Sequence, residues 1–203
     1  TPMGAVETAM IDAAYAQVGK SFGFPTHAYM GASDSKVIDY QAGMESSTTA
    51  MIGALAGINM ISGAGMLDFL ASFSPEKLLI DAEAIGMAQR MLKGIVPQTD
   101  PLAANMYEGI DFKGDFLKQR LTGQLLRKEQ YFPSPIIDRG SIRTWQDEGS
   151  LDTFDRAKNQ LKELLNSYQP PDLPAEQLAE LNAMVSRMAS DAGMKKLPEL
   201  NHS

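Results

Sequence analysis

The stretch from Phe24 to Gly65 reads FPTHAYMGASDSKVIDYQAGMESSTTAMIGALAGINMISGAG. Its pattern predicts a short strand over residues 26–30, a polar turn, a helix over residues 39–57 and a second strand over residues 58–62. Two strands that are joined through one helix form the repeating unit of a parallel sheet. Loops at the carboxyl ends of such strands are where α/β proteins bind their ligands. We therefore expect a functional site in this stretch.

Helices are predicted on both sides of the stretch. Residues 4–22 have apolar side chains at helical spacing, which predicts one buried face made of Val6, Met10, Ala13, Ala14 and Val18. The helix over residues 39–57, which Asp39 can cap, has a face of small residues suited to close packing, namely Ala42, Ser46, Thr49, Ala50, Gly53 and Ala54. Ser74 and Pro75 begin a further helix that runs to Gly94, with an apolar face of Leu78, Ala82, Ile85 and Leu92.

The second half of the chain reads as helical. We expect residues 100–131 to be mostly helical, with a break at Phe132–Pro135 and a short helix over residues 142–148. A longer helix is predicted between a Ser150 cap and Pro170, and a last one from about Pro174 with an apolar face of Leu178, Leu181, Val185 and Met188. The final residues, His202 among them, are expected to form a loose tail.

Composition narrows the class of protein. The chain has 203 residues, of which 44% are hydrophobic, and this is enough for one core. Its net charge of −7 argues against nucleic acid or an anionic membrane surface as the main partner, because both favour clusters of lysine and arginine. Without cysteine there is no disulfide and no thiolate metal site. No apolar run is long enough to span a membrane and no signal peptide is visible, so we expect a cytoplasmic protein. Because the sequence starts at Thr1, we also expect a chain cut from a longer protein.

Few residues in the stretch have side chains suited to chemistry. Alternation along the first strand sends His27 and Tyr29 to the same side. A single strand histidine is more often a hydrogen-bonded structural residue than a catalytic or binding one. Gln41 and Glu45 share a helix face, where such pairs are usually solvated, but their small neighbours favour burial.

The loops of the stretch give weaker signals. Asp34 lies in a polar loop that either holds a ligand or forms a turn. Gly63 and Gly65 permit close approach by a ligand, but they lack the rest of a nucleotide-binding motif. The thirteen methionines are expected to fill the core. No metal constellation, Ser-His-Asp order or P-loop is visible, and spacing identifies no catalytic residue.

Residues 33–95 carry a resemblance to a known family. They resemble the C-terminal part of the trimethylamine methyltransferase family, which includes the glycine betaine methyltransferases. The matching elements are Asp34-Ser-Lys36, Asp39-x-Gln-Ala-Gly-x-Glu45 and Gly63-Ala-Gly-Met-Leu67, with Phe132-Pro133, Asp138-Arg139, Trp145 and Asp155-Arg156-Ala157 extending the resemblance to about Leu165. Members of the family resemble a (β/α)8 TIM-type barrel of roughly twice this length.

The resemblance implies a fold and a reaction. Residues 1–96 would supply the last βα units of the barrel, and residues 97–203 a helical C-terminal extension that packs on it. The implied reaction moves a methyl group from a quaternary or tertiary amine to a cobalt corrinoid, which a separate partner protein carries. The founding members use pyrrolysine in a segment that aligns near Gly31. This chain has none, which favours a quaternary amine such as glycine betaine.

The resemblance also implies site residues and partners. His27 and Tyr29 are then substrate contacts, Asp34, Gln41 and Glu45 are polar groups of the pocket or of its support, and Gly31, Gly63 and Gly65 lie in the loops around it. No cofactor would be bound directly. Half a barrel exposes strand edges, so a homo-oligomer or a pairing with the missing half is expected. Two alternatives stay open: a non-catalytic barrel fragment, and a binding module for a small ammonium compound.

Overall fold

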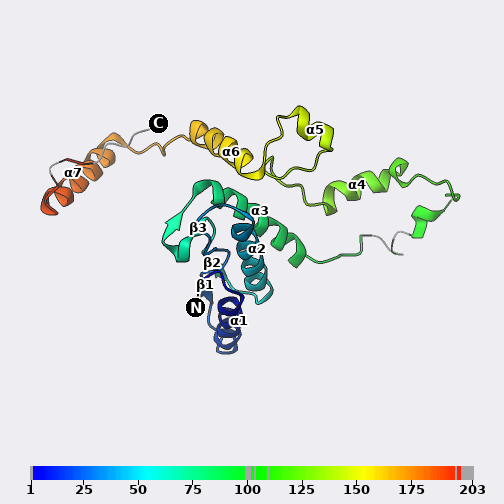
Figure 1. Cartoon of the computed structure of the whole chain (residues 1–203), viewed down its shortest axis with the longest axis horizontal. Helices are drawn as coiled ribbons and strands as arrows, with labels where there is room; N and C mark the ends of the chain where they lie inside the picture. The colour runs from blue at the N-terminus through cyan, green and yellow to red at the C-terminus, as the bar shows by residue number, and fades with distance from the viewer. Residues whose placement is uncertain (1, 99–101, 103, 109, 195, 198–203) are drawn as a thin grey trace. The chain divides into compact units, whose positions relative to one another are not determined.

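The computed structural model describes residues 2–98, 102, 104–108, 110–194 and 196–197 (Figure 1). Contacts divide the chain into one unit of residues 1–165 and a second of residues 166–203. The elements of the first unit, in chain order, are α1 (Val6–Ser21), β1 (His27–Ala28), α2 (Tyr40–Leu55), β2 (Met60–Ile61), β3 (Met66–Leu67), η1 (Asp68–Leu70), β4 (Ser72–Phe73), α3 (Pro75–Leu92), η2 (Ala104–Tyr107), η3 (Phe116–Lys118), α4 (Arg120–Glu129), α5 (Ile142–Asp147) and α6 (Thr153–Ser167), whose last two residues pass into the second unit. The second unit holds α7 (Ala175–Asp191).

A parallel β-α-β unit forms the centre of the first unit. β1 and β2 pair in parallel, with His27 opposite Met60 and Ala28 opposite Ile61. The helix α2 connects them, and its cap Asp39 accepts a hydrogen bond from the Ala42 amide at 3.2 Å. The predicted pair of adjacent parallel strands is thus confirmed, although each strand is only two residues long.

Close packing of small residues joins α2 to the strands. The predicted small-residue face is buried at Ala42, Ser46, Thr49, Ala50 and Gly53, while Ala54 is half-buried. A Cβ atom at Gly53 would lie 2.8 Å from Ile61 Cδ1 of β2 and 3.0 Å from the Met30 sulfur, so the absence of a side chain lets the helix approach the strand region closely. The apolar core next to this contact consists of Ala9, Ala16, Ala28, Met30 and Ile58.

The predicted buried face of α1 is wrong. The helix buries Ala9 and Ala16, whereas Val6, Met10 and Val18 are 49%, 63% and 57% exposed. The helix has two neighbouring apolar faces, and the spacing of apolar residues alone does not show which of them packs against the rest of the chain. Here the space beside Ala28 and Met30 is filled by alanine, and the larger side chains lie outside it.

The helix α3 begins as predicted, because Ser74 accepts a hydrogen bond from the Lys77 amide and Pro75 occupies the first turn. Its predicted apolar face is wrong, since Leu78 and Leu92 are exposed and Lys77, Asp81, Glu83 and Ala88 are buried instead. The antiparallel pair β3–β4 just before this helix was not predicted.

The segment after α3 contains less helix than expected. Between residues 100 and 131 the described residues form only η2, η3 and α4, while residues 99–101, 103 and 109 lie outside the description. The break at Phe132–Pro135 and the short helix α5 are confirmed. The helix α6 starts at Thr153, after Ser150, whose φ of 55° is not helical. His202 lies outside the described residues.

Polar contacts of Arg90 and Glu83 link α3 to the later segment, and Arg90 pairs with Glu129 at 3.2 Å. Glu83 accepts hydrogen bonds from the Tyr131 hydroxyl at 3.0 Å and from the Ser134 amide at 3.1 Å. Burial raises the pKa of Tyr131, and the hydrogen bond to Glu83 and its charge raise it further. The division of the chain between residues 96 and 97 stays a prediction.

The helix α7 of the second unit starts at the predicted position. Its predicted apolar face is exposed at all four positions, Leu178, Leu181, Val185 and Met188. Among the described residues, no helix combines the length and the apolar character needed to cross a membrane.

Candidate functional site

The loop that follows β1 is buried although it is polar. Ser33, Asp34 and Ser35 are all below a tenth exposed. Gly31 opens the loop with a φ of +77°, a conformation that glycine adopts without strain, and its amide donates to the Thr49 hydroxyl at 2.9 Å. The polar loop predicted from the sequence is therefore a buried turn hydrogen-bonded to α2, and its role toward a ligand stays a prediction.

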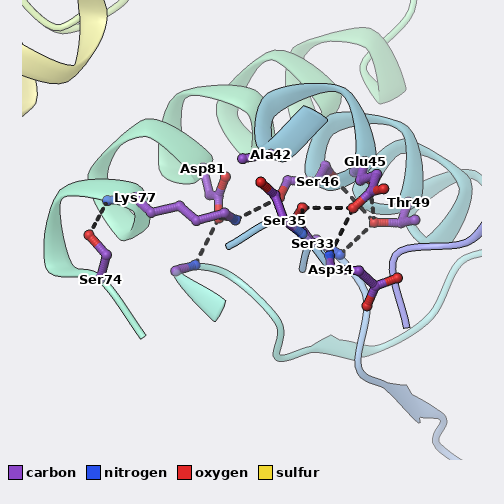
Figure 2. Close-up of polar contacts among 12 residues, drawn as sticks. Ser33, Asp34, Ser35, Ala42, Glu45, Ser46, Thr49, Ser74, Lys77 and Asp81 are labelled. Carbon is purple, nitrogen blue, oxygen red and sulfur yellow. Dashed lines mark hydrogen bonds and ion pairs between the residues drawn. The ribbon is translucent and has the colours of Figure 1, made fainter. Parts of the chain in front are cut away.

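Glu45 is the main anchor of this loop (Figure 2). Its Oε2 atom accepts hydrogen bonds from the Ser33 hydroxyl at 2.7 Å and from the Asp34 amide at 2.8 Å. Its Oε1 atom accepts from the Gln41 side-chain amide at 2.8 Å, so the predicted pair on one helix face does interact. Partial burial raises the pKa of Glu45, but these hydrogen bonds and the charge of Lys36 outweigh it and lower the pKa below its usual value.

The loop that follows β2 is held in the same way from α3. The Gly65 amide donates to Asp81 Oδ2 at 2.8 Å, and the ammonium of Lys77 is paired with the same carboxylate atom. Lys77 also donates to the Ser46 hydroxyl at 2.7 Å, which ties α3 to α2 (Figure 2). Lys77 and Asp81 are 1% and 3% exposed. Burial raises the pKa of Asp81, and its bonds to Lys77 and Gly65 oppose that rise.

A backbone hydrogen bond joins the two loops, because the Ser33 amide donates to the Met66 carbonyl at 3.1 Å. Gly63 and Gly65 let the backbone approach its neighbours closely here. A Cβ atom at Gly63 would lie 2.4 Å from the Met30 carbonyl oxygen, and one at Gly65 would lie 2.6 Å from the Phe73 ring. The atoms that lie close to these two glycines therefore belong to this chain. A contact between the glycines and a ligand stays a prediction.

His27 and Tyr29 lie on the other side of β1 from the core. Ala28 and Met30 are buried while His27 and Tyr29 are exposed, as alternation predicts. The two rings meet edge to face at 5.1 Å between centroids, and His27 Nε2 lies 2.5 Å from the Ser62 hydroxyl. This bond crosses from β1 to the end of β2. The histidine thus has a structural partner, and its role toward a substrate stays a prediction.

A pocket of about 410 Å³ lies beside the loop after β1. It brings together three of the predicted site residues, Asp34, Gln41 and Glu45, and is not lined by His27 or Tyr29. Its other lining residues are Pro2, Ala5, Ser35, Lys36 and Phe69. Two carboxylates and an aromatic ring favour a cationic ligand. Among the described residues, no group of three or more histidine, aspartate or glutamate side chains is placed to hold a metal ion.

Sequence reasoning missed the hydrogen-bonding roles of four residues of this arrangement. Ser33, Thr49, Lys77 and Asp81 carry the bonds that fix the two loops. The spacing of Lys77 and Asp81, four residues apart, is a signal that could have predicted their ion pair on a helix. Its burial depends on Ser46 and Gly65, which are distant in the sequence.

Comparisons with known proteins found a family model and relatives that match most of this chain. A family model described as Trimethylamine methyltransferase (MTTB) matches residues 1–193. A trimethylamine methyltransferase of Methanosarcina mazei, MttB2, is 34% identical over 92% of this chain and 37% of its own length. A glycine betaine methyltransferase of Desulfitobacterium hafniense is 34% identical over 94% of this chain and 40% of its own length. The chain therefore spans well under half the length of these relatives.

Proposed function

Because this chain belongs to the trimethylamine methyltransferase family, we propose that it is the C-terminal part of an enzyme that transfers a methyl group from an amine to a corrinoid protein. The observation that carries the proposal is the match over residues 1–193, together with relatives named for trimethylamine and for glycine betaine. The methyltransferase family is shown by these matches, while the corrinoid partner is part of the proposal.

We further propose that the β-α-β unit belongs to a TIM-type barrel. Two observations support this. The strands β1 and β2 are parallel and connected through a helix, and each has only one neighbour among the described residues. A two-stranded sheet is marginally stable alone, so other strands are expected on both sides. The loops after β1 and β2 would then lie at the carboxyl end of the barrel, where such enzymes have their active sites.

A quaternary amine is the substrate that fits best. In the transfer, the bond between a methyl carbon and the ammonium nitrogen breaks and its electron pair stays on the nitrogen. The methyl carbon bonds to the cobalt(I) of the co-substrate, which supplies the nucleophile. The leaving group is a neutral tertiary amine, so no proton is required. The residues of this chain therefore have to bind and orient a cation, for which the carboxylates of Asp34 and Glu45 are suited.

A chimera tests the proposed methyltransferase function against the two alternatives, a binding module and a non-catalytic fragment. It is possible to design because this chain aligns with 40% of the glycine betaine methyltransferase. We expect a chimera of the remainder of that relative and this chain to form dimethylglycine and methylated corrinoid protein in equal amounts. The unaltered relative is the positive control. A folded chimera that binds betaine without transfer would favour the binding module, and one that does neither would favour the non-catalytic fragment.

Location and association complete the proposal. A cytoplasmic location and a homo-oligomer stay predictions. The exposed apolar side chains of α1, among them Val6, Met10 and Val18, support association, because a helix face of this kind is normally covered.

A further inference from the structure

The turn between β3 and β4 has an unusual backbone. Asp68, Phe69 and Leu70 have φ angles of 49°, 55° and 70°, so three successive residues with side chains are left-handed. Each such residue costs about 1–2 kcal/mol, and strain of this kind concentrates at ligand clamps and active sites. A glycine here would relieve the strain, but it would also remove the side chains that the turn presents. The side chains themselves thus need an explanation.

The turn presents a ring and a carboxylate to one ammonium group. The Lys36 nitrogen lies 4.4 Å from the centroid of the Phe69 ring and 3.2 Å from Asp68 Oδ1. It also donates to the backbone carbonyl of Asp34 at 2.7 Å. A ring face and a carboxylate are the groups that recognise quaternary ammonium ligands. In this structure they hold the chain's own cation.

Lys36 is able to leave this position. Its side chain is 63% exposed and has a flexible four-carbon stem. An exposed pair of this kind holds its partners weakly. A competing cation therefore has little to displace.

The pocket next to the ring has an excess of negative charge. Phe69, Lys36 and the carboxylates of Asp34 and Glu45 all line it. Asp34 is 8% exposed, and its Oδ2 accepts from the Gly4 amide at 2.8 Å. Its Oδ1 atom has no hydrogen-bond partner within the described part of the chain. A buried carboxylate oxygen without a donor favours a positive charge nearby.

From these observations we infer that Phe69 and Asp68 form the binding site for the ammonium group of a quaternary amine, which takes the place of the Lys36 ammonium. Lys36 then turns to the other end of the ligand and pairs with a carboxylate such as that of a betaine. The inference rests on the proposed function only for the identity of the amine. It assigns the ammonium to the β3–β4 turn and the carboxylate to Lys36, and neither role depends on His27.

Binding of matched ligands to the 203-residue chain tests the site. Calorimetry would compare glycine betaine, tetramethylammonium and 3,3-dimethylbutyrate, in which carbon replaces the charged nitrogen of betaine. We expect betaine to bind and the uncharged isostere to bind much more weakly. Phe69→Leu should weaken betaine about two- to thirtyfold, the range of cation–π contributions. Phe69→Trp should retain binding, and Phe24→Leu, which alters an exposed ring outside this pocket, should have no effect.

Lys36→Met separates the two roles of the lysine. Removing the resident cation should strengthen tetramethylammonium binding, whereas betaine also loses its carboxylate partner. The ratio of betaine affinity to tetramethylammonium affinity should therefore fall, which a purely structural lysine would not cause. Asp68→Asn should weaken both ligands.

Several results would overturn the inference. The first is equal affinity for betaine and 3,3-dimethylbutyrate. The second is an unchanged betaine affinity in Phe69→Leu. The third is that neither betaine nor tetramethylammonium binds at millimolar concentration. The proposed function is tested separately by the chimera. If Phe69→Leu leaves methyl transfer unchanged, the inferred ammonium site is wrong and the proposed function stands. If betaine binds through Phe69 but no methyl transfer occurs, the ammonium site stands and the proposed function is wrong.

Discussion

The carboxylate of Glu45 accepts a hydrogen bond from the backbone amide of Asp34 at 2.8 Å, so a side chain of α2 fixes the loop through which the chain enters that helix. The same oxygen also accepts from the Ser33 hydroxyl. A buried polar loop needs such partners, because unpaired groups there would cost about 1–3 kcal/mol each. Glu45 is thus a support of the candidate pocket as well as one of its walls.

Glu45→Gln should lower stability at neutral pH by about 1–3 kcal/mol, because charged hydrogen bonds are replaced by weaker ones. The pKa of Glu45 is lowered in the folded chain, so its contribution is present above the unfolded pKa and is lost as the pH falls through the folded value. The unfolding free energy of the unchanged chain should therefore fall more steeply in acid than that of the variant. Urea unfolding between neutral and acidic pH measures this, with the exposed Glu7→Gln as control.

The parts of the fold that were predictable from the sequence depend on local signals. The order of β1, α2 and β2 follows from a cap at Asp39, glycines at the turns and a face of small residues. The buried face of α1 was not predictable, because Ala9 and Met10 are neighbours and only the packing partner decides which is covered. The β3–β4 pair was missed because its strands are two residues long and its turn is left-handed without glycine.

In the candidate site, too, some residues were predictable from the sequence and others were not. Family resemblance identified Asp34, Gln41 and Glu45, which the structure brings to one pocket. Phe69 was not found, because its place beside Lys36 depends on a turn from a different part of the sequence. Burial of Lys77 was unexpected for a similar reason, since its partner Ser46 is 31 residues away.

Breaking the buried pair of Lys77 and Asp81 should be costly. Asp81→Asn leaves the Lys77 ammonium buried without its counter-charge, and removing one partner of such a pair costs about 3–5 kcal/mol. Lys77→Met should cost a similar amount by isolating the carboxylate. The double variant should be more stable than the sum of both losses predicts, because no uncompensated charge remains. Strictly additive losses in chemical unfolding would show that the pair does not act as a unit.

Two glycine substitutions should have opposite effects. A Cβ atom at Gly63 would lie 2.4 Å from the Met30 carbonyl oxygen, so Gly63→Ala must shift the backbone and should cost at least about 1–3 kcal/mol. Gly43 lies inside α2, and a Cβ atom there would meet nothing within 4 Å. Gly43→Ala should therefore stabilise the chain by about 0.5–1 kcal/mol. Thermal unfolding of both variants makes the comparison, and equal effects would contradict the packing described for Gly63.

His27 offers a test between a structural role and substrate binding. Its Nε2 atom lies 2.5 Å from the Ser62 hydroxyl, so we expect the bond to join β1 to the end of β2. His27→Ala and Ser62→Ala should then lower stability by similar amounts, about 0.5–1.5 kcal/mol, the usual contribution of one hydrogen bond.

Ligand binding completes the test of His27. If Lys36 meets the carboxylate of a betaine, His27→Ala should leave the affinities for betaine and tetramethylammonium in the same ratio. The sequence-based alternative is that the imidazole donates to this carboxylate. In that case His27→Ala would weaken betaine about ten- to a hundredfold and tetramethylammonium far less, since a hydrogen bond to a charged group contributes about 1.5–3 kcal/mol. Such a selective loss, with Ser62→Ala unaffected, would assign the carboxylate to His27 in place of Lys36.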